Sequence, residues 1–187
     1  MWLEVETKAR VKDPINLRKK IKSIAKLDKK ETRTDKYFAI KNKLLKKKYP
    51  KKAFRIREKP NKFEINFKKK IKELSDKEIV VKKEFEFSIK EKKDIENLSE
   101  LFKDLNFEEW VEKTKITESY KYRKNKNLTI ELHKVKSLGY FLEIEYLCQE
   151  KEVEKAKQLI NTALKELEIN KKDIDNTGYT KMLWSLK

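Results

Sequence analysis

The sequence has very few of the residues that build several common kinds of site. A single cysteine, Cys148, excludes a disulfide within the chain, and a single histidine, His133, excludes a structural zinc site made of Cys and His ligands. Only Gly139 and Gly178 are glycines, so glycine-rich phosphate-binding loops are not expected. No apolar run reaches the length of a signal peptide or a membrane span. We therefore expect a cytoplasmic protein without membrane contact, in which side chains perform any phosphate recognition.

Charged residues are abundant instead. Lys and Arg number 50 against 32 Asp and Glu, which gives a formal net charge of +18 over 187 residues. Such an excess attracts anionic partners of any size, from a nucleotide to a nucleic acid. With so few Cys and His, a bound metal would be a hard ion held by carboxylates, hence Mg²⁺ or Mn²⁺. The length predicts one domain, residues 1–187, with a core that needs no disulfide.

Several strand-like segments alternate apolar with charged residues. In residues 2–11, Glu4, Glu6 and Lys8 share one face and Leu3 and Val5 the other, because successive side chains of a strand point to opposite faces. A half-solvated strand would show the same alternation, but here the pattern recurs. Polar residues of fixed spacing also occur at Arg55 and Arg57, at Glu64, Asn66 and Lys68, at Lys82, Glu84 and Glu86, at Lys113 and Lys115, and at Glu143 and Glu145.

Periodicity places these strands among helices. Asp13-Pro14 supplies an N-cap and a first-turn proline for a helix that runs to about residue 26. Apolar residues at helical spacing predict further helices at about 91–106 and 150–167. Strands are expected near 2–11, 30–41, 52–60, 61–70, 79–89, 109–123, 127–136 and 139–149. Antiparallel strands in this number tend to close, since closure removes unpaired edges, so we predict an α+β fold with an antiparallel β-barrel and helices packed outside.

The apolar strand faces decide which side of this barrel points inward. Apolar helix stripes need an apolar surface to cover, and the strands offer Leu3, Val5, Phe54, Ile56, Phe63, Ile65, Phe67, Phe85, Phe87, Leu142 and Ile144. If these residues lie outside under the helices, the charged faces line the interior. An unpaired ion in such a place costs several kcal/mol, so the interior must be wet, cross-paired or filled by a ligand and its metal.

The segments Glu4-x-Glu6-x-Lys8, Thr34–Phe38, Arg55-Ile56-Arg57, Lys82-x-Glu84-x-Glu86, Lys113-x-Lys115 and Val135–Glu145 follow one another in a characteristic order. In this order they resemble the CYTH superfamily, also called triphosphate tunnel metalloenzymes. The resemblance runs from residue 1 to about 146. It implies a closed eight-stranded antiparallel tunnel in which basic side chains bind a triphosphate and acidic ones hold one or two divalent metals, Mg²⁺ or Mn²⁺.

The resemblance also implies roles for individual residues. Those expected at the metals are Glu4, Glu6, Glu143, Glu145, Glu84, Glu86 and Glu131. Those expected at phosphate oxygens are Lys8, Arg55, Arg57, Lys68, Lys82, Lys113, Lys115 and Arg123. His133 stands where the family often has Asp, with Glu131 on the same face as a substitute. It is a candidate general base, although a hydrogen-bonded wall residue is the simpler interpretation.

Chain length, the helix after the fifth strand and the opening Glu4–Ala9 look most like the class IV adenylate cyclase branch, which converts ATP to cyclic AMP and pyrophosphate. The first alternative is a triphosphatase that hydrolyses thiamine triphosphate, tripolyphosphate or a nucleoside triphosphate. The second is a non-catalytic binder of nucleotides or RNA. We expect a small-molecule triphosphate as partner and a monomer or homodimer, with nucleic acid as the less favoured ligand.

Overall fold

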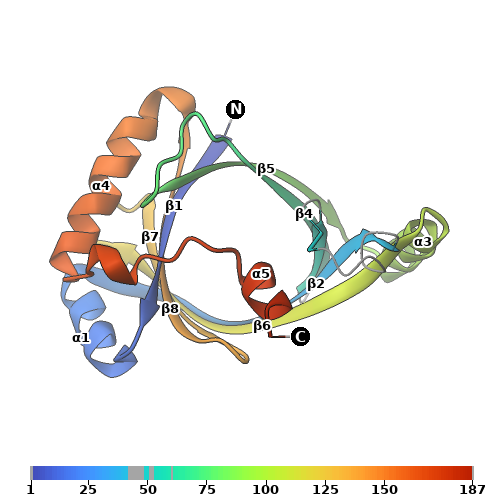
Figure 1. Cartoon of the computed structure of the whole chain (residues 1–187), viewed down its shortest axis with the longest axis horizontal. Helices are drawn as coiled ribbons and strands as arrows, with labels where there is room; N and C mark the ends of the chain where they lie inside the picture. The colour runs from blue at the N-terminus through green and yellow to red at the C-terminus, as the bar shows by residue number, and fades with distance from the viewer. Residues whose placement is uncertain (1, 42–48, 51–52, 60, 187) are drawn as a thin grey trace. The chain divides into compact units, whose positions relative to one another are not determined.

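The computed structural model describes residues 2–41, 49–50, 53–59 and 61–186. Its main elements, shown in Figure 1, are β1 (Trp2–Val11), α1 (Pro14–Ile24), β2 (Ala25–Ile40), β3 (Phe54–Lys59), β4 (Lys62–Lys70), β5 (Val80–Ile89), α3 (Lys92–Asp104), β6 (Phe107–Tyr122), β7 (Leu128–Val135), β8 (Gly139–Gln149), α4 (Val153–Glu166) and α5 (Tyr179–Trp184). The predicted strands and helices are confirmed in type and order, but β2 begins at Ala25 and not near residue 30, so α1 ends earlier than predicted, and α5 is an addition. Lys52 and Pro60, at the ends of one predicted strand, lie outside the described residues.

The eight strands form a closed barrel in the order β1-β5-β4-β3-β2-β6-β7-β8. The strand pairs with a recorded register are antiparallel, for example β1 with β8, in which Lys8 lies opposite Glu143. This confirms the predicted α+β fold with a closed eight-stranded antiparallel barrel. Within the described part of the chain, no helix combines the length and the apolar character that crossing a membrane requires.

The chain divides into two compact units. Unit 1 comprises Met1–Thr32, Lys69–Glu84 and Lys115–Thr177, and unit 2 comprises Arg33–Lys68, Phe85–Thr114 and Gly178–Lys187. Each unit combines segments that are far apart in the sequence. The expectation of a single domain over residues 1–187 stays a prediction.

In unit 1, the core lies between the strands and the helices α1 and α4. Asp13 begins α1 by accepting hydrogen bonds from the backbone N–H groups of Ile15 and Asn16. Leu3 and Val5 of β1 are fully buried in one cluster with Ile21 of α1 and Ile160 of α4. Figure 1 shows both helices on the outer side of β1, β7 and β8. The predicted inversion is therefore confirmed here: the apolar strand face lies under the helices, and the charged face points away from them.

In unit 2, half-buried aromatic rings pack together beside a small buried cluster of Ala39, Trp110 and Val111. Phe54 of β3 stacks on Phe38 of β2 with 5.5 Å between ring centroids, and Phe102 of α3 lies 4.5 Å from Phe54. The expectation that helices cover Phe85 and Phe87 is wrong, because these side chains are 37% and 65% exposed. The aromatic side chain of α3 is engaged by the strand residues Phe38, Phe54 and Phe107, so Phe87 is left at the surface.

Candidate active site

In unit 1, the polar face of β1 meets charged residues of both neighbouring strands. The register places Glu4 opposite Lys82 of β5, and Glu6 opposite Glu145 of β8. The Lys82 ammonium donates a hydrogen bond to the Glu6 carboxylate. The Lys8 ammonium, which is buried, donates to the carbonyl oxygen of Thr177. The first strand thus brings carboxylates and ammonium groups onto one enclosed face, as its alternation predicts.

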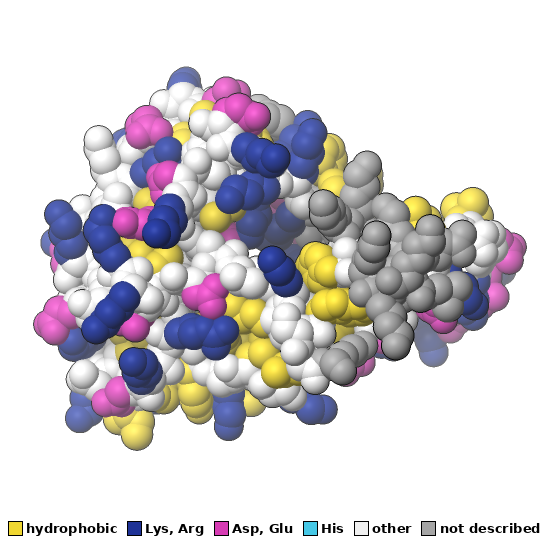
Figure 2. Space-filling model, in the orientation of Figure 1, with side chains coloured by type: hydrophobic (Ala, Val, Ile, Leu, Met, Phe, Trp, Pro, Cys, Tyr) yellow, Lys and Arg dark blue, Asp and Glu magenta, His cyan; other side chains and the backbone are white. Residues whose placement is uncertain are grey.

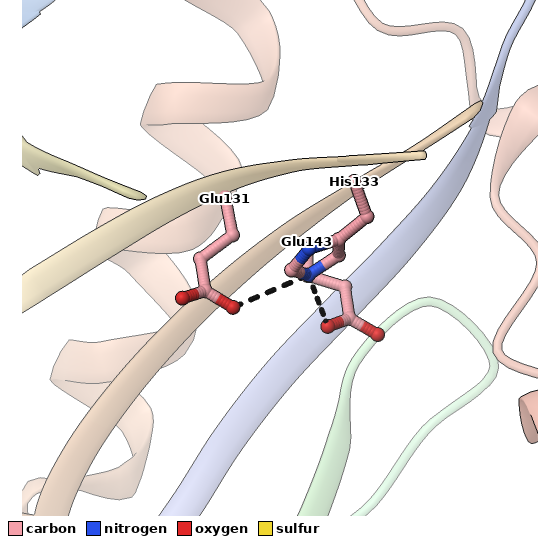
Figure 3. Close-up of side chains that lie close together, drawn as sticks. All are labelled: Glu131, His133 and Glu143. Atoms are coloured by element: carbon pink, nitrogen blue, oxygen red, sulfur yellow. Dashed lines mark hydrogen bonds and ion pairs between the residues drawn. The ribbon is translucent and has the colours of Figure 1, made fainter. Parts of the chain in front are cut away.

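A second group on this face joins β7 and β8. The Nε2 atom of His133 lies 2.7 Å from Oε2 of Glu143 and 3.2 Å from Oε2 of Glu131. Figure 3 shows both carboxylates directed at the imidazole ring. The candidate ligand atoms of these three residues all lie within 4.8 Å of one another. Side chains of β6 surround the group: Lys115 approaches Nε2 at 3.1 Å, and Thr117 lies 2.9 Å from Nδ1.

Burial and crowding shift the proton affinities of these groups. Burial raises the pKa of Glu6 to about 7, with Glu4 and Glu143 adding to the effect and Lys82 opposing it. For Glu143, burial would raise the pKa, but Lys115 and His133 outweigh it and hold the pKa well below its usual range. Burial lowers the pKa of Lys8 to about 8, against the attraction of Glu143 and Glu6. The face therefore contains carboxylates that repel one another and that a cation would stabilise.

These residues fit a divalent metal ion. Two carboxylate oxygens and one imidazole nitrogen converge, and such oxygen and nitrogen donors bind Mn²⁺ and related ions. Glu4 and Glu6 lie close enough for a side-chain hydrogen bond, and Glu145 is the cross-strand neighbour of Glu6. Five carboxylates of the predicted set thus lie on adjoining strands of unit 1. These placements give no direct test of the roles, which stay predictions.

In unit 2, three of the predicted cations contact one fully buried carboxylate. Asp35 of β2 accepts hydrogen bonds from Arg57 at 2.6 Å and 3.0 Å, through Nε and Nη2. Lys113 of β6 lies 2.9 Å from the same carboxylate, and Arg55 lies 3.5 Å from it. The Tyr37 hydroxyl accepts a hydrogen bond from Lys113 at 3.0 Å. One buried anion therefore holds arginine and lysine side chains from two strands, β3 and β6.

Asp35 is the main residue that the sequence reasoning missed. Burial would raise its pKa, but Lys113, Arg57 and Arg55 outweigh burial and hold the pKa of Asp35 far below its usual range. The pairing of β2 with β3 places Asp35 opposite Arg57 and Tyr37 opposite Arg55, and the sequence alone does not specify this register. The Tyr37 hydroxyl belongs to the same group, since it accepts a hydrogen bond from Lys113.

The remaining predicted residues lie in less enclosed positions. Lys68 of β4 and Glu84 of β5 are half-buried, and exposed Glu86 accepts a hydrogen bond from Asn66 at 3.5 Å. Arg123 lies in an exposed turn after β6 and donates to the carbonyl oxygen of Lys22 at 3.2 Å. That contact is with the end of α1, so the described contacts do not join Arg123 to the other predicted cations. Its expected role at a phosphate gains no support from this position.

The comparisons with known proteins agree with the resemblance. The family model of the CYTH domain matches residues 3–179, so the chain belongs to the CYTH domain family. No curated protein matches the sequence.

Solved structures of similar fold include two archaeal proteins. The PH1819 protein of Pyrococcus horikoshii OT3 is 28% identical with a TM-score of 0.77, over 98% of this chain and 99% of that one. The PH1012 protein of the same organism is 26% identical with a TM-score of 0.75, over 95% and 98%. A proposed adenylyl cyclase from Hippeastrum, described as having a dominant triphosphatase activity, shares the fold at 16% identity with a TM-score of 0.68, over 100% and 97% of the two chains.

Proposed function

We propose that the chain is a metal-dependent enzyme that cleaves a triphosphate substrate, and that it converts ATP to cyclic AMP and pyrophosphate. One observation carries the proposal. In unit 1, carboxylates able to hold a divalent cation share an enclosed strand face with the ammonium groups of Lys8, Lys82 and Lys115. A triphosphate bound with a divalent cation needs both kinds of group, because phosphate oxygens require several cations and the metal requires carboxylates.

The carboxylates of Glu4, Glu6, Glu143 and Glu145, with Glu131 beside them, would hold the metal ion. When bound, the ion would neutralise phosphate charge and lower the pKa of the attacking hydroxyl. Lys8, Lys82 and Lys115 bind phosphate oxygens, and the neighbouring carboxylates keep these ammonium groups in place. Glu84 and Glu86 would help to hold a second ion or would orient nearby cations.

In unit 2, the residues that we propose bind phosphate oxygens are Arg55, Arg57, Lys68 and Lys113. Arg57 uses Nε and Nη2 for Asp35, which occupies one edge of its guanidinium group. The other edge can donate to a phosphate oxygen, since a guanidinium carries five N–H donors. Asp35 thereby positions these cations without neutralising their combined positive charge, because one carboxylate contacts three positive side chains.

The cyclase reaction is favoured by the resemblance of the sequence to the class IV branch. In that reaction the ribose 3′-hydroxyl attacks the α-phosphorus and pyrophosphate leaves. Hydrolysis is the second candidate, with thiamine triphosphate, tripolyphosphate or a nucleoside triphosphate as substrate. It is favoured by the triphosphatase activity described for the Hippeastrum protein, which shares the fold. Water would then replace the ribose hydroxyl as nucleophile at the same group of residues.

A non-catalytic binder of nucleotides or RNA is the third candidate, and the net charge of +18 is its support. Figure 2 shows the Lys and Arg side chains of the visible face interspersed with Asp and Glu. RNA held by such a surface would dissociate steeply as salt increases, because counterion release dominates that binding. A metal-triphosphate complex would depend mainly on the divalent ion.

Product analysis tests the proposal. The purified protein is incubated with ATP and Mg²⁺ or Mn²⁺, and the products are separated by chromatography. Cyclic AMP with pyrophosphate supports the cyclase, whereas ADP or AMP with phosphate supports the hydrolase. Parallel incubations with tripolyphosphate and thiamine triphosphate identify a triphosphatase of another substrate. Intact substrate in every incubation, with a chelator-treated sample as reference, would reject an enzymatic function.

A further inference from the structure

The one histidine of the chain lies at the centre of the acidic group of unit 1. His133 is fully buried, and its side chain is enclosed by residues of three strands, β6, β7 and β8. We propose that His133 is a metal ligand and that it makes this site select a first-row transition-metal ion over Mg²⁺. The proposal deepens the proposed function, since it takes this ion to be the one that serves the triphosphate reaction.

The distances around Nε2 match those between neighbouring ligands of one metal ion. Transition-metal ions bind imidazole nitrogen and carboxylate oxygen at about 2.0–2.2 Å, so adjacent ligand atoms lie about 3 Å apart. In the structure, Nε2 is 2.7 Å from Oε2 of Glu143 and 3.2 Å from Oε2 of Glu131. The three donors thus already lie close to the spacing that a metal ion requires, on the strands β7 and β8 (Figure 3).

Outer partners hold two of the three donors, His133 and Glu131, in their orientation. The Thr117 hydroxyl lies 2.9 Å from Nδ1 of His133, and the Ser119 hydroxyl donates to Oε1 of Glu131 at 2.5 Å. In each case the partner contacts the atom that does not face the other donors. Hydrogen bonds of this kind at the far side of a ligand fix the ring and the carboxylate for metal binding.

Lys115 shows that a cation is favoured at this point. Its ammonium lies 3.1 Å from Nε2 of His133 and 3.4 Å from Oε2 of Glu143. Nε2 thus faces one ammonium group and two carboxylate oxygens, whereas Nδ1 faces the Thr117 hydroxyl. A metal ion bound at Nε2 would take the place of the ammonium group, and Nδ1 would then carry the ring proton towards Thr117.

The donor chemistry then determines the selectivity. Mg²⁺ binds oxygen ligands and keeps its waters, whereas first-row transition metals accept imidazole nitrogen with affinities that rise from Mn²⁺ to Co²⁺. An aspartate at this position would offer only oxygen. With His133, we expect the dissociation constants to fall in the order Mg²⁺, Mn²⁺, Co²⁺.

Metal binding without substrate provides the test. The metal-free, untagged protein is titrated with Mg²⁺, Mn²⁺ and Co²⁺ by calorimetry, beside the variant His133→Asp. Wild type should bind Co²⁺ at least about tenfold more tightly than Mg²⁺, and the variant should reduce this ratio by about tenfold or more. Pulsed electron paramagnetic resonance of the Mn²⁺ complex should show an imidazole nitrogen coupling that can come only from His133, the single histidine.

Two further variants keep the proposal testable even if His133→Asp does not fold. Thr117→Val keeps the ligand but removes its outer partner, so the nitrogen coupling should remain while Co²⁺ affinity falls about tenfold. Thr162→Val, on the exposed side of α4, is the matched control and should change neither. Absence of nitrogen coupling in wild type, or equal affinity for the three ions, would overturn the proposal and leave His133 as a wall residue. Neither result depends on product formation, so the proposed enzymatic function is tested separately.

Discussion

Arg57 holds Asp35 through two parallel hydrogen bonds, 2.6 Å from Nε to Oδ1 and 3.0 Å from Nη2 to Oδ2. The Asp35 carboxylate is fully buried, and Lys113 approaches it at 2.9 Å from another strand. Paired guanidinium and carboxylate groups of this geometry are strong because both bonds are charge-assisted. Asp35 therefore fixes two of the predicted phosphate-binding cations in unit 2.

The first prediction concerns the stability that Asp35 provides. Asp35→Asn should lower the free energy of unfolding by about 3 kcal/mol, because it removes the buried countercharge of Arg57 and Lys113. Urea denaturation followed by circular dichroism measures the change. Asp28→Asn, at an exposed position of β2, is the matched control and should shift the free energy of unfolding by less than about 0.5 kcal/mol. Equal effects of the two substitutions would contradict the importance of this ion pair.

The second prediction concerns acid. Because Lys113, Arg57 and Arg55 outweigh burial, the folded pKa of Asp35 lies below its unfolded value of about 3.9. The contribution of Asp35 to stability is thus complete above pH of about 4 and is lost as the pH falls towards the lower folded pKa. Between pH 4 and pH 2, the melting temperature of wild type should fall more steeply than that of Asp35→Asn. Parallel curves would show that other carboxyl groups control acid unfolding.

The strands, three of the helices and the inverted barrel could be predicted because alternation and helical spacing carry that information directly. Leu3 and Val5 indicate which face of β1 the helices cover, and both side chains are fully buried in the structure. The exposure of Phe87 could not be predicted. The alternation of residues shows on which face of a strand a side chain lies, but not how far a helix extends over that face. The short α5, six residues long, carries too few turns for a periodic signal.

At the candidate site, the sequence indicated which residues share a face but not which of them touch. Glu143 and Glu131 were expected on the polar face, and the β7–β8 register brings them opposite each other. Asp35 was missed because its effect depends on the register of β2 with β3, which no local pattern specifies. Thr117 was not predicted for the same reason, because a threonine in a strand has no distinguishing feature until its partner is known.

The third prediction addresses the metal-binding carboxylates. Glu6→Gln should abolish turnover of the triphosphate substrate while the protein remains folded, because a site for a dication loses one negative charge. Product formation and a thermal melt are measured on the same sample. Glu100→Gln, at an exposed position of α3, provides the control and should keep wild-type turnover, since its carboxylate pairs only with Lys103 among the recorded ion pairs of the described residues. Full activity of Glu6→Gln would refute the assignment of the first strand.

The fourth prediction separates the charge of Arg57 from its shape. Arg57→Ala should weaken binding of a non-hydrolysable ATP analogue by about 1.5–3 kcal/mol, the value of a hydrogen bond to a charged group. Arg57→Lys should recover only part of that loss, because lysine keeps the charge but cannot contact Asp35 and a phosphate through two edges of one planar group. Calorimetric titration in the presence of the divalent ion gives both affinities.

Arg18→Lys is the matched control for this substitution, since Arg18 lies on α1 and pairs with Glu118 at 2.9 Å. It changes the same side chain on a helix of unit 1 and should leave the affinity for the analogue unaltered. If Arg57→Lys binds as tightly as wild type, positive charge alone accounts for the role of residue 57, and the orientation imposed by Asp35 has no part in binding. If Arg57→Ala also binds as tightly, Arg57 does not contact the phosphates at all.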